Sequence, residues 1–418
     1  MTTILKKTHL VGQVVPTAPR APHFTLDWTA EYQGTVYSVR FSAGGRLLAA
    51  GCDGIVRIFE IQTREEICVL EHSVSTGKSP LPVRSICFTQ NGKYLAAGGD
   101  DGGISIWDLE TYHAILCLAG HTGAINTLES SPDSRLIVSG SSDATVRVWE
   151  TDTWEYSILE IIGSRKSNYD VTSVIVSTDG QWLAAGSFDG VIRIWDLATK
   201  TLIERLRGHQ EPILAMSFNF DGSKLISSSC DDGNFKYWNI QPMVDAVTDA
   251  VSSEGLSSLS LKQDKKQSVH RWPIPEDKKD GIGELGSYCM SSFEPEESEG
   301  HELLSMAVSP YGPWAVSGVE DGTVQFWNPS EAKIPSKLEL EGQSGHVTSM
   351  MLRPLQKILA TASDDGYIRI CKSKRRPQPR SSQNIDALTQ GLILKRRKST
   401  TAFIFLVSKR CRADKISL

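Results

Sequence analysis

Residues 120–150 read GHTGAINTLESSPDSRLIVSGSSDATVRVWE, and residues 169–196 read YDVTSVIVSTDGQWLAAGSFDGVIRIWD. Each stretch contains an apolar strand, a strand rich in small residues, an aspartate, and a third strand that alternates apolar and polar side chains and ends in tryptophan. The turn signals DG, SPDS and STDG separate these strands. The pattern predicts a repeated unit of antiparallel β-strands.

The unit occurs seven times along the chain. The turn aspartates are Asp53, Asp101, Asp143, Asp189, Asp232, Asp321 and Asp365. The residues six positions later are Phe59, Trp107, Trp149, Trp195, Trp238, Trp327 and Cys371. The steps between successive aspartates are 48, 42, 46, 43, 89 and 44 residues. A fixed inner spacing within a variable outer spacing indicates a constant hairpin with connections of variable length.

A four-stranded unit of about 40 residues cannot bury both of its faces alone, so such units pack side by side into a closed ring. We therefore predict an all-β fold, a seven-bladed β-propeller, over residues 24–373. The last unit supplies only three strands, and the strand-like stretch FTLDWT (24–29) is expected to complete it as its outer strand. Residues 1–23 are expected to form a flexible arm, and residues 374–418 a basic tail.

The chain resembles the WD-repeat family. Gly-His dipeptides open three units, at Gly120-His121, Gly208-His209 and Gly345-His346. The strand-end dipeptide that names the family stands at Trp107-Asp108 and Trp195-Asp196. The resemblance implies a propeller closed by an N-terminal strand, and it does not specify a function, because propellers host many.

The step of 89 residues contains an insertion at residues 241–284, between the third and fourth strands of the fifth blade. Its polar, Ser-rich sequence predicts disorder. A hidden eighth blade is the alternative, but no aspartate stands six positions before a tryptophan there. Because the insertion joins strands three and four, it is expected to emerge on the face opposite to the top face defined below.

Charge is distributed unevenly along the chain. Residues 374–418 carry 12 Lys and Arg against 2 Asp and Glu, whereas the rest carries 32 against 47. The acidic body is a poor match for DNA, which demands a basic surface. The tail clusters KSKRRPQPR and KRRK (395–398) predict a nuclear localisation signal or nucleic-acid contacts. The alternative is a divergent or mispredicted C-terminus.

Several classes of protein are not indicated by the composition. No apolar run reaches the roughly 18 residues of a membrane helix, and the N-terminus has no signal-peptide pattern. The eight cysteines form no CxxC pair, so neither a zinc site nor a disulfide framework is expected, and an intracellular location fits. No metal ion or cofactor is predicted.

Two motifs suggest catalysis, and both have a structural explanation. His121, Ser139 and Asp143 match the residue types of a nucleophilic triad. In the WD-repeat pattern, however, tryptophan, Ser or Thr, histidine and aspartate form a buried hydrogen-bond chain, and several units repeat parts of it. The STGKS stretch (75–79) has His72 where a phosphate loop needs glycine, and no helix follows. We therefore do not expect an enzyme.

A partner is expected on the face that carries the loops between strands two and three, called the top face here. Each blade shows two positions there. The first follows the first apolar residue of strand one: Tyr37, Arg84, Asn126, Thr172, Leu214, Leu304 and Thr348. The second precedes the turn aspartate: Cys52, Asp100, Ser142, Phe188, Asp231, Glu320 and Asp364.

Four carboxylates of the top face (Asp100, Asp231, Glu320, Asp364) would surround four exposed large side chains (Tyr37, Phe188, Leu214, Leu304). Aromatic anchors with a charged surround are typical of peptide binding. The alternative is that some of these side chains point into the central channel or against neighbouring blades.

The layout also resembles the C-terminal propeller of fungal Tup/Groucho-class transcriptional corepressors, through residues 84–110 and 173–209, the loop at 72–82 and a fourth blade without Gly-His. This resemblance implies a nuclear, or otherwise cytoplasmic, scaffold that binds transcription factors, histone tails or other complex subunits and does not read DNA sequence. Such corepressors carry an N-terminal helical segment and a Gln-rich stretch, whereas 23 residues precede the first predicted strand here. We therefore expect partner binding without assembly of a full corepressor complex.

The alternative function is a substrate receptor of a cullin-RING ubiquitin ligase, or another WD-repeat adaptor. Many such receptors carry Trp-Asp-x-Arg at the end of strand three. Here Trp107-Asp108 is followed by Leu109-Glu110, and Trp195-Asp196 by Leu197-Ala198.

Overall fold

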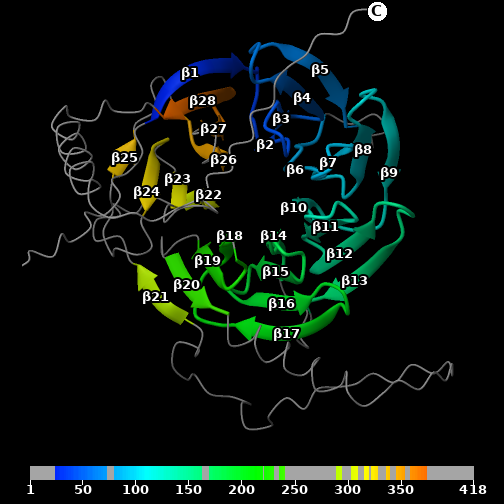
Figure 1. Ribbon diagram of the computed structural model, residues 1–418, viewed down its shortest axis with the longest axis vertical. Helices are drawn as coiled ribbons and strands as arrows, with labels where there is room; N and C mark the ends of the chain where they lie inside the picture. Colours follow the sequence, from blue (N-terminus) through cyan, green and yellow to red (C-terminus); the bar gives the residue numbers. More distant parts are fainter. Residues whose placement is uncertain are drawn as a thin grey trace, which may run out of the picture. The chain divides into compact units, whose positions relative to one another are not determined.

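In the computed structural model, seven four-stranded antiparallel sheets surround a common axis as the blades of a β-propeller (Figure 1). The structure describes residues 24–72, 80–161, 169–219, 221–229, 235–240, 289–293, 303–308, 315–319, 322–327, 336–338, 345–353 and 358–373. Within these residues every regular element is a strand. The all-β fold and the seven predicted blades are confirmed.

The first four blades follow one another along the chain. Blade one consists of β2 (Ser38–Phe41), β3 (Leu47–Gly51), β4 (Ile55–Glu60) and β5 (Glu66–Glu71). Blade two consists of β6 (Ser85–Phe88), β7 (Tyr94–Gly98), β8 (Ile104–Asp108) and β9 (Ala114–Leu118). Blade three consists of β10 (Ile125–Ser130), β11 (Leu136–Ser141), β12 (Thr145–Glu150) and β13 (Tyr156–Glu160). Blade four consists of β14 (Val171–Val176), β15 (Trp182–Ser187), β16 (Ile192–Asp196) and β17 (Thr201–Leu206).

The remaining three blades include the two irregular connections. Blade five consists of β18 (Ile213–Phe218), β19 (Lys224–Ser229), β20 (Phe235–Asn239) and β21 (Cys289–Phe293). Blade six consists of β22 (Leu303–Val308), β23 (Ala315–Val319), β24 (Val324–Trp327) and β25 (Ser336–Leu338). Blade seven consists of β26 (Val347–Arg353), β27 (Ile358–Ser363), β28 (Tyr367–Ser373) and β1 (Phe24–Glu31).

The ring is closed by its N-terminal strand, as the sequence predicts. Strand β1 pairs antiparallel with β28, from Phe24 opposite Ser373 to Glu31 opposite Tyr367 (Figure 1). Phe24 also stacks on Phe326 of blade six, with ring centroids 5.5 Å apart. The first strand therefore joins the last blade.

The insertion lies where the sequence places it, between the third and fourth strands of blade five, because β20 pairs directly with β21. The predictions of disorder or an eighth blade for residues 241–284, of a flexible arm for residues 1–23, and of a basic tail for residues 374–418 lie outside the described residues.

The hydrophobic core lies between blades. One cluster packs Val56, Ile58 and Leu70 of blade one against Leu95 and Trp107 of blade two, and similar clusters join other neighbouring blades. Small residues in the second strands, such as the Leu-Ala-Ala-Gly run of β3, let the sheets approach closely. The alternating apolar side chains of each sheet therefore face the next sheet.

Hydroxyl groups of the innermost strands also join the blades. Ser85 Oγ accepts the backbone N–H of Leu128, at 2.8 Å from N to O, and Thr127 Oγ1 accepts that of Val174 at 3.2 Å. Ser349 Oγ makes the same contact with Val39 across the closure of the ring, at 3.2 Å. Polar groups near the central channel are thus satisfied by the next blade.

Candidate functional site

A buried hydrogen-bond chain crosses blade three and ends at its turn aspartate. His121 Nε2 lies 2.7 Å from Ser139 Oγ, and the Trp149 indole N–H donates to the same hydroxyl at 2.9 Å. The other ring nitrogen of His121 lies 2.8 Å from Asp143 Oδ2. Ser139 is fully buried, so its hydroxyl cannot attack a substrate. The His–Ser–Asp set fixes the turn between β11 and β12, as the sequence predicts.

The same chain keeps Asp143 ionised. Burial alone would raise the pKa of Asp143, but the carboxylate accepts hydrogen bonds from the His121 ring, the Thr145 hydroxyl and the Thr122 backbone N–H. Together these bonds hold the pKa of Asp143 well below its ordinary value.

Blades two and five contain parts of this chain. In blade five, His209 Nε2 lies 2.7 Å from Ser227 Oγ, which accepts the Trp238 indole N–H at 2.8 Å. In blade two, His72 Nε2 lies 3.2 Å from Asp101 Oδ1. Burial would raise the pKa of Asp101, but the hydrogen bond and charge of His72, together with the backbone N–H of Gly103, lower it.

His72 is a structural residue that our sequence analysis missed. It lacks a preceding glycine, and it stands 29 residues before its aspartate, whereas His121 stands 22 residues before its own. The surplus equals the length of the stretch 73–79, which holds the GKS motif and lies outside the described residues. If the length of that stretch is subtracted from the spacing between His72 and Asp101, the spacing matches that of His121 and Asp143, and this signal in the sequence identifies His72 as the partner of its turn aspartate.

Blades four and seven replace the histidine with an arginine of the third strand. Arg193 donates to Ser187 Oγ and to Asp189 Oδ2, both at 2.7 Å. Arg369 donates to Ser363 Oγ and Asp365 Oδ2, both at 2.9 Å. Burial would raise the pKa of Asp189, but the hydrogen bond and charge of Arg193 lower it.

His346 lies outside the buried site of its blade. It is 49% exposed, its backbone N–H donates to Asp364 Oδ1 at 2.7 Å, and its ring Nδ1 lies 3.5 Å from Asp364 Oδ2. The dipeptide Gly345-His346 marks the start of blade seven in the sequence, but Arg369 takes the place that a histidine has in blade three.

The other repeat markers are placed as follows. Trp107 and Trp195 are buried between blades. In blade one, the turn aspartate Asp53, six residues before Phe59, accepts a hydrogen bond from the Tyr37 hydroxyl. Asp232, Asp321 and the side chain of Trp327 lie outside the described residues.

Three of the seven first positions turn toward the neighbouring blade. Asn126 donates its side-chain amide to the carbonyl of Val171 at 3.0 Å. Thr172 donates its hydroxyl to the carbonyl of Ile213, and Thr348 donates to that of Val36. These polar side chains join the first strands of adjacent blades, which is the alternative that the sequence analysis left open.

Two of the four predicted large anchors are less exposed than expected. The hydroxyl of the half-buried Tyr37 donates to Asp53 Oδ1 at 3.0 Å, and burial together with this bond raises the pKa of Tyr37. Leu214 is half-buried as well. The prediction that both are exposed is wrong, and for Tyr37 the reason is the bond that holds its ring against Asp53 of the same blade. The side chain of Leu304 lies outside the described residues.

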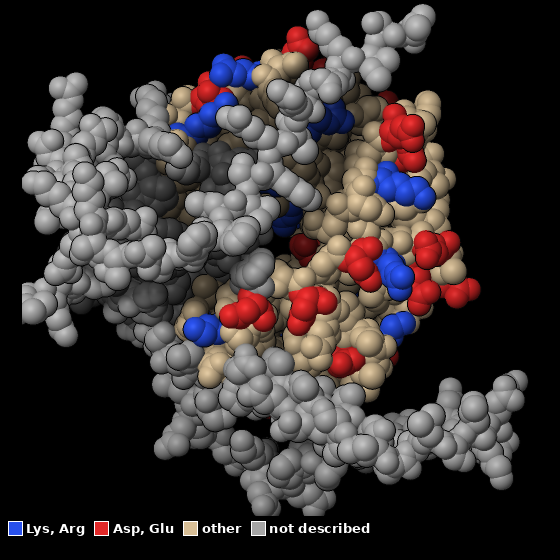
Figure 2. Space-filling view, viewed as in Figure 1, with Lys and Arg blue, Asp and Glu red and all other residues tan. Residues whose placement is uncertain are grey.

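The described carboxylates of the top face have cationic or polar partners. Arg84 binds Asp100 through two nitrogens, with Nε facing Oδ1 and Nη2 3.3 Å from Oδ2. Asp364 contacts His346, as described above. Asp231 and Glu320 lie outside the described residues. On the face that Figure 2 shows, acidic and basic side chains alternate over the described blades, and neither sign forms a continuous patch.

Among the top-face residues that the structure describes, Phe188 is the large apolar one that is exposed. Its side chain is 51% exposed, while its backbone N–H donates to the carbonyl of Asp170 at 2.9 Å. The flanking Ser187 and Asp189 are both held by Arg193. A rigid turn therefore presents a phenyl ring that its own blade does not bury.

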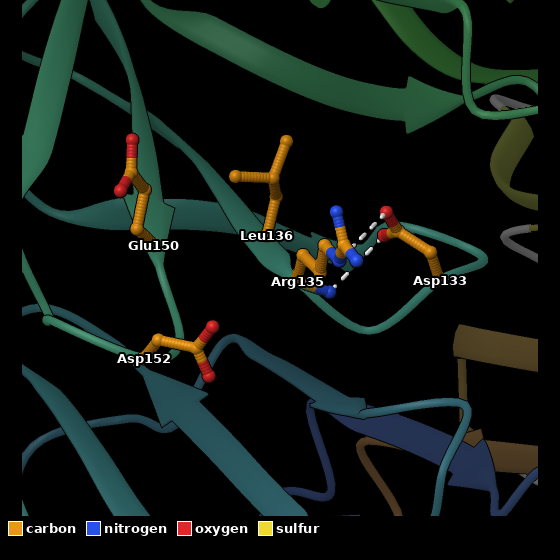
Figure 3. Close-up of a pocket in the computed structure, with 5 residues that line it drawn as sticks. All are labelled: Asp133, Arg135, Leu136, Glu150 and Asp152. Carbon is orange, nitrogen blue, oxygen red and sulfur yellow. Dashed lines mark hydrogen bonds and ion pairs between the residues drawn. The ribbon is translucent and has the colours of Figure 1, made fainter.

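A shallow depression lies on the opposite face of blade three, at the turns between β10 and β11 and between β12 and β13. Figure 3 shows Asp133 and Arg135 turned toward each other, with Glu150 and Asp152 beyond Leu136. Arg135 Nε lies 3.9 Å from Asp133 Oδ2, and Nζ of Lys200 in blade four lies 3.9 Å from Glu150 Oε1. These exposed pairs contribute little to stability.

Neither a metal centre nor a membrane span is found in the part of the chain that the structure describes. No group of three or more His, Cys, Asp or Glu side chains is placed to hold a metal ion there. Within the same residues, no helix has the length and apolarity needed to cross a bilayer.

Comparison with known proteins identifies relatives that share the repeat. The chain is 25% identical over 297 residues to a WD repeat-containing protein 26 homolog of Arabidopsis thaliana, covering 68% of this chain and 47% of the relative. It is 28% identical over 138 residues to a DDB1- and CUL4-associated factor 11 homolog of Caenorhabditis briggsae, covering 30% of this chain and 24% of the relative. It is 24% identical over 295 residues to a periodic tryptophan protein 2 homolog of Dictyostelium discoideum, covering 66% and 31%.

The chain thus spans about half, or less, of the length of these relatives. None of the three is a corepressor of the Tup/Groucho class by its name, so that finer resemblance is not shown.

The family model "WD domain, G-beta repeat" matches residues 25–60, 68–108, 113–150, 157–196, 200–239, 288–328 and 336–372, well over half of the chain. Each of the seven matches covers the outer strand of one sheet and the three inner strands of the next sheet, so successive repeats interlock neighbouring blades. The chain therefore belongs to the WD40 family of repeat proteins and is a propeller scaffold for protein interactions.

Proposed function

We propose that this propeller binds a peptide segment of its partner on the top face, with Phe188 as the apolar anchor. The observation that carries the proposal is the 51% exposure of the Phe188 side chain on a turn that Arg193 holds in place. A preorganised aromatic side chain loses little entropy when it binds, and aromatic residues dominate interface energies.

The charged groups of the top face give the expected partner its second property. The Arg84–Asp100 and His346–Asp364 pairs are partly exposed, so each can exchange its partner for a charged group of a peptide at small cost. We therefore propose a peptide with one buried apolar side chain and charged flanks, in which charge sets specificity more than affinity.

The proposed partners are segments of transcription factors or histone tails, so that the protein acts as a nuclear, corepressor-like scaffold. This part of the proposal rests on the resemblance of residues 84–110 and 173–209 to Tup/Groucho propellers. The described carboxylates add less support than the sequence suggested, because Asp100 and Asp364 already have partners.

The second candidate is a substrate receptor of a cullin-RING ubiquitin ligase. The similarity to a protein named as associated with DDB1 and CUL4 favours it. Against it stand the missing arginines after both Trp-Asp dipeptides. Asp108 instead accepts the backbone N–H groups of Glu110 and Thr111, both at 2.9 Å, and so caps a turn.

The test is affinity capture from nuclear extract with the full chain, its Phe188→Ala variant and a Leu26→Ala control. Leu26 is 37% exposed on the outer strand of blade seven, away from the top-face loops. Circular dichroism checks that all three proteins fold. We expect Phe188→Ala to reduce capture of histones or transcription factors about 30-fold, the effect of losing a central aromatic anchor.

Three results would decide the matter. A loss confined to Phe188→Ala supports the top-face site. Capture of DDB1 and CUL4 by all three proteins favours the receptor function. Equal capture of the same nuclear partners by Phe188→Ala and wild type overturns the top-face site.

A further inference from the structure

The outer strands of blades one, two and three expose a row of apolar side chains. On β5 these are Ile67 and Val69, on β9 Ile115 and the free thiol Cys117, and on β13 Tyr156 and Ile158. The outer strand of blade four differs, because β17 carries Glu204 and Arg205. A run of exposed apolar residues over three successive blades is more than the scattered surface residues that need no explanation.

The centre of this row, β9, is a sheet edge without charge. Among the described strands, only β8 pairs with β9, so its other edge is open. Its sequence, Ala-Ile-Leu-Cys-Leu, has no charged residue and no proline. The other outer strands with described side chains, β1, β5, β13 and β17, all contain Asp or Glu. Proteins usually protect edges with charge or proline, so β9 differs from the other outer strands whose side chains the structure describes.

The apolar surface beside β9 continues into blade three. Leu116 and the buried Leu118 pack against the cluster that contains Trp149. Tyr156 of β13 lies over that tryptophan, with ring centroids 4.6 Å apart, and the Arg147 guanidinium lies 4.4 Å from the tyrosine ring. A strand added at β9 would therefore have the apolar surface of blade three on one face and would lie beside Ile115 and Cys117 on the other.

The charges around this surface determine what can occupy it. Strands β5, β9 and β13 contain three glutamates, Glu66, Glu71 and Glu160, and no lysine or arginine. Glu66 is paired with Arg57 of β4, so Glu71 and Glu160 give this surface its acidic character. Pairing of β9 with the same edge of a second copy would bring these acidic surroundings together, and like charges repel. A segment with basic flanks would instead be attracted.

We propose that the free edge of β9 binds an extended segment of a partner protein as a fifth strand of blade two. The segment has apolar β-branched residues at alternate positions, which lie beside Ile115 and Cys117, and basic residues at both ends. Backbone hydrogen bonds to β9 provide affinity, and the exposed side chains of β9 and β13 provide specificity. This site is separate from the top face and does not depend on Phe188.

The test is a fluorescence titration of the full chain with the labelled peptide KKTVTVTVKK. We expect saturable binding that weakens at least tenfold in Ile115→Lys, because lysine on the edge repels the peptide and opposes strand addition. The matched control is Thr201→Lys, an exposed position on the outer strand of blade four. Maleimide labelling of Cys117, mapped by mass spectrometry, should slow when the peptide is bound.

Two further peptides test the mode of binding. KKTVTPTVKK loses a backbone N–H, and EETVTVTVEE reverses the flanking charge, so both should bind at least tenfold more weakly. Equal binding by the three peptides, equal effects of the two lysine variants, or no saturable binding would overturn the proposal. A wild-type dimer that Ile115→Lys converts to a monomer would also overturn it, since the edge would then be a self-interface.

Discussion

Blades three and four place an arginine at the same point of their third strands, and the two arginines do different things. Arg147 and Arg193 each stand two residues before the tryptophan. In blade four, Arg193 turns inward and binds Ser187 and Asp189. In blade three, His121 contacts the turn aspartate, and Arg147 instead donates to the carbonyl of Gly120 at 2.7 Å and lies over Tyr156.

The difference shows that the turn aspartate requires a hydrogen-bond donor and not a particular residue. Blade two has the same arrangement as blade three, because the ring of His72 contacts its turn aspartate, Asp101. Blade seven has the same arrangement as blade four, because His346 lies at the surface and Arg369 turns inward to its turn aspartate, Asp365. The loop that enters each blade therefore decides where the third-strand cation points.

The largest expected effect comes from removing the inward arginine. Arg193→Met leaves the carboxylate of Asp189 without its charge partner, and breaking a buried pair costs about 3 kcal/mol or more. Arg147→Met is the matched control, because no carboxylate pairs with Arg147 among the described residues, and it should cost about half as much. Urea unfolding measures both. Equal losses would show that the two arginines are equivalent.

The next effect sharpens the comparison of the histidines. His121→Ala removes the group that joins Ser139 to Asp143, leaves buried polar atoms unpaired, and should cost about 2 kcal/mol. His346→Ala should cost less than about 0.5 kcal/mol, because its ring contact with Asp364 is exposed and long, at 3.5 Å from Nδ1 to Oδ2. Thermal unfolding checks the order. A larger loss for His346→Ala would contradict the placement of the two rings.

A smaller effect depends on pH. The folded-state pKa of Asp189 is lowered from an ordinary value of 3.8. Its stabilisation is therefore complete well above pH 3.8 and is lost as the pH falls toward the lowered folded-state pKa, because the unfolded chain takes up the proton first. The difference in unfolding free energy between wild type and Asp189→Asn should shrink from pH 5 to pH 2.5. A difference that stays constant would show that Asp189 is not tuned by Arg193.

The smallest effect concerns the residue after the turn aspartate. Gly190 in blade four has φ 71°, and Ala144 in blade three has φ 64°, in the same left-handed turn. A Cβ atom disfavours this conformation by about 1 kcal/mol, so Ala144→Gly should stabilise the protein slightly. The urea midpoint should rise. A fall would mean that the added chain entropy of glycine outweighs the relief of strain.

The sequence was sufficient for the ring but not for its contacts. The spacing of Asp143 and Trp149, repeated along the chain, predicted the blades, and FTLDWT predicted the closure. The contact of Asn126 with Val171 could not be predicted, because it joins residues 45 positions apart across two blades. The same holds for the choice between Arg369 and His346, which depends on how the loop before the blade packs and not on which residue types are present.

The pairing of β1 with β28 also determines when the ring can close during translation. Thr25 and its hydrogen-bond partner Lys372 are 347 residues apart in the chain. At 5–20 residues per second, β1 leaves the ribosome roughly 20–70 s before its partner exists. During that interval the early blades stand as an open arc, with the apolar side chains of β1 and the first blade uncovered. A newly made chain therefore needs protection from aggregation for longest at its first strand, which is also where its folding ends.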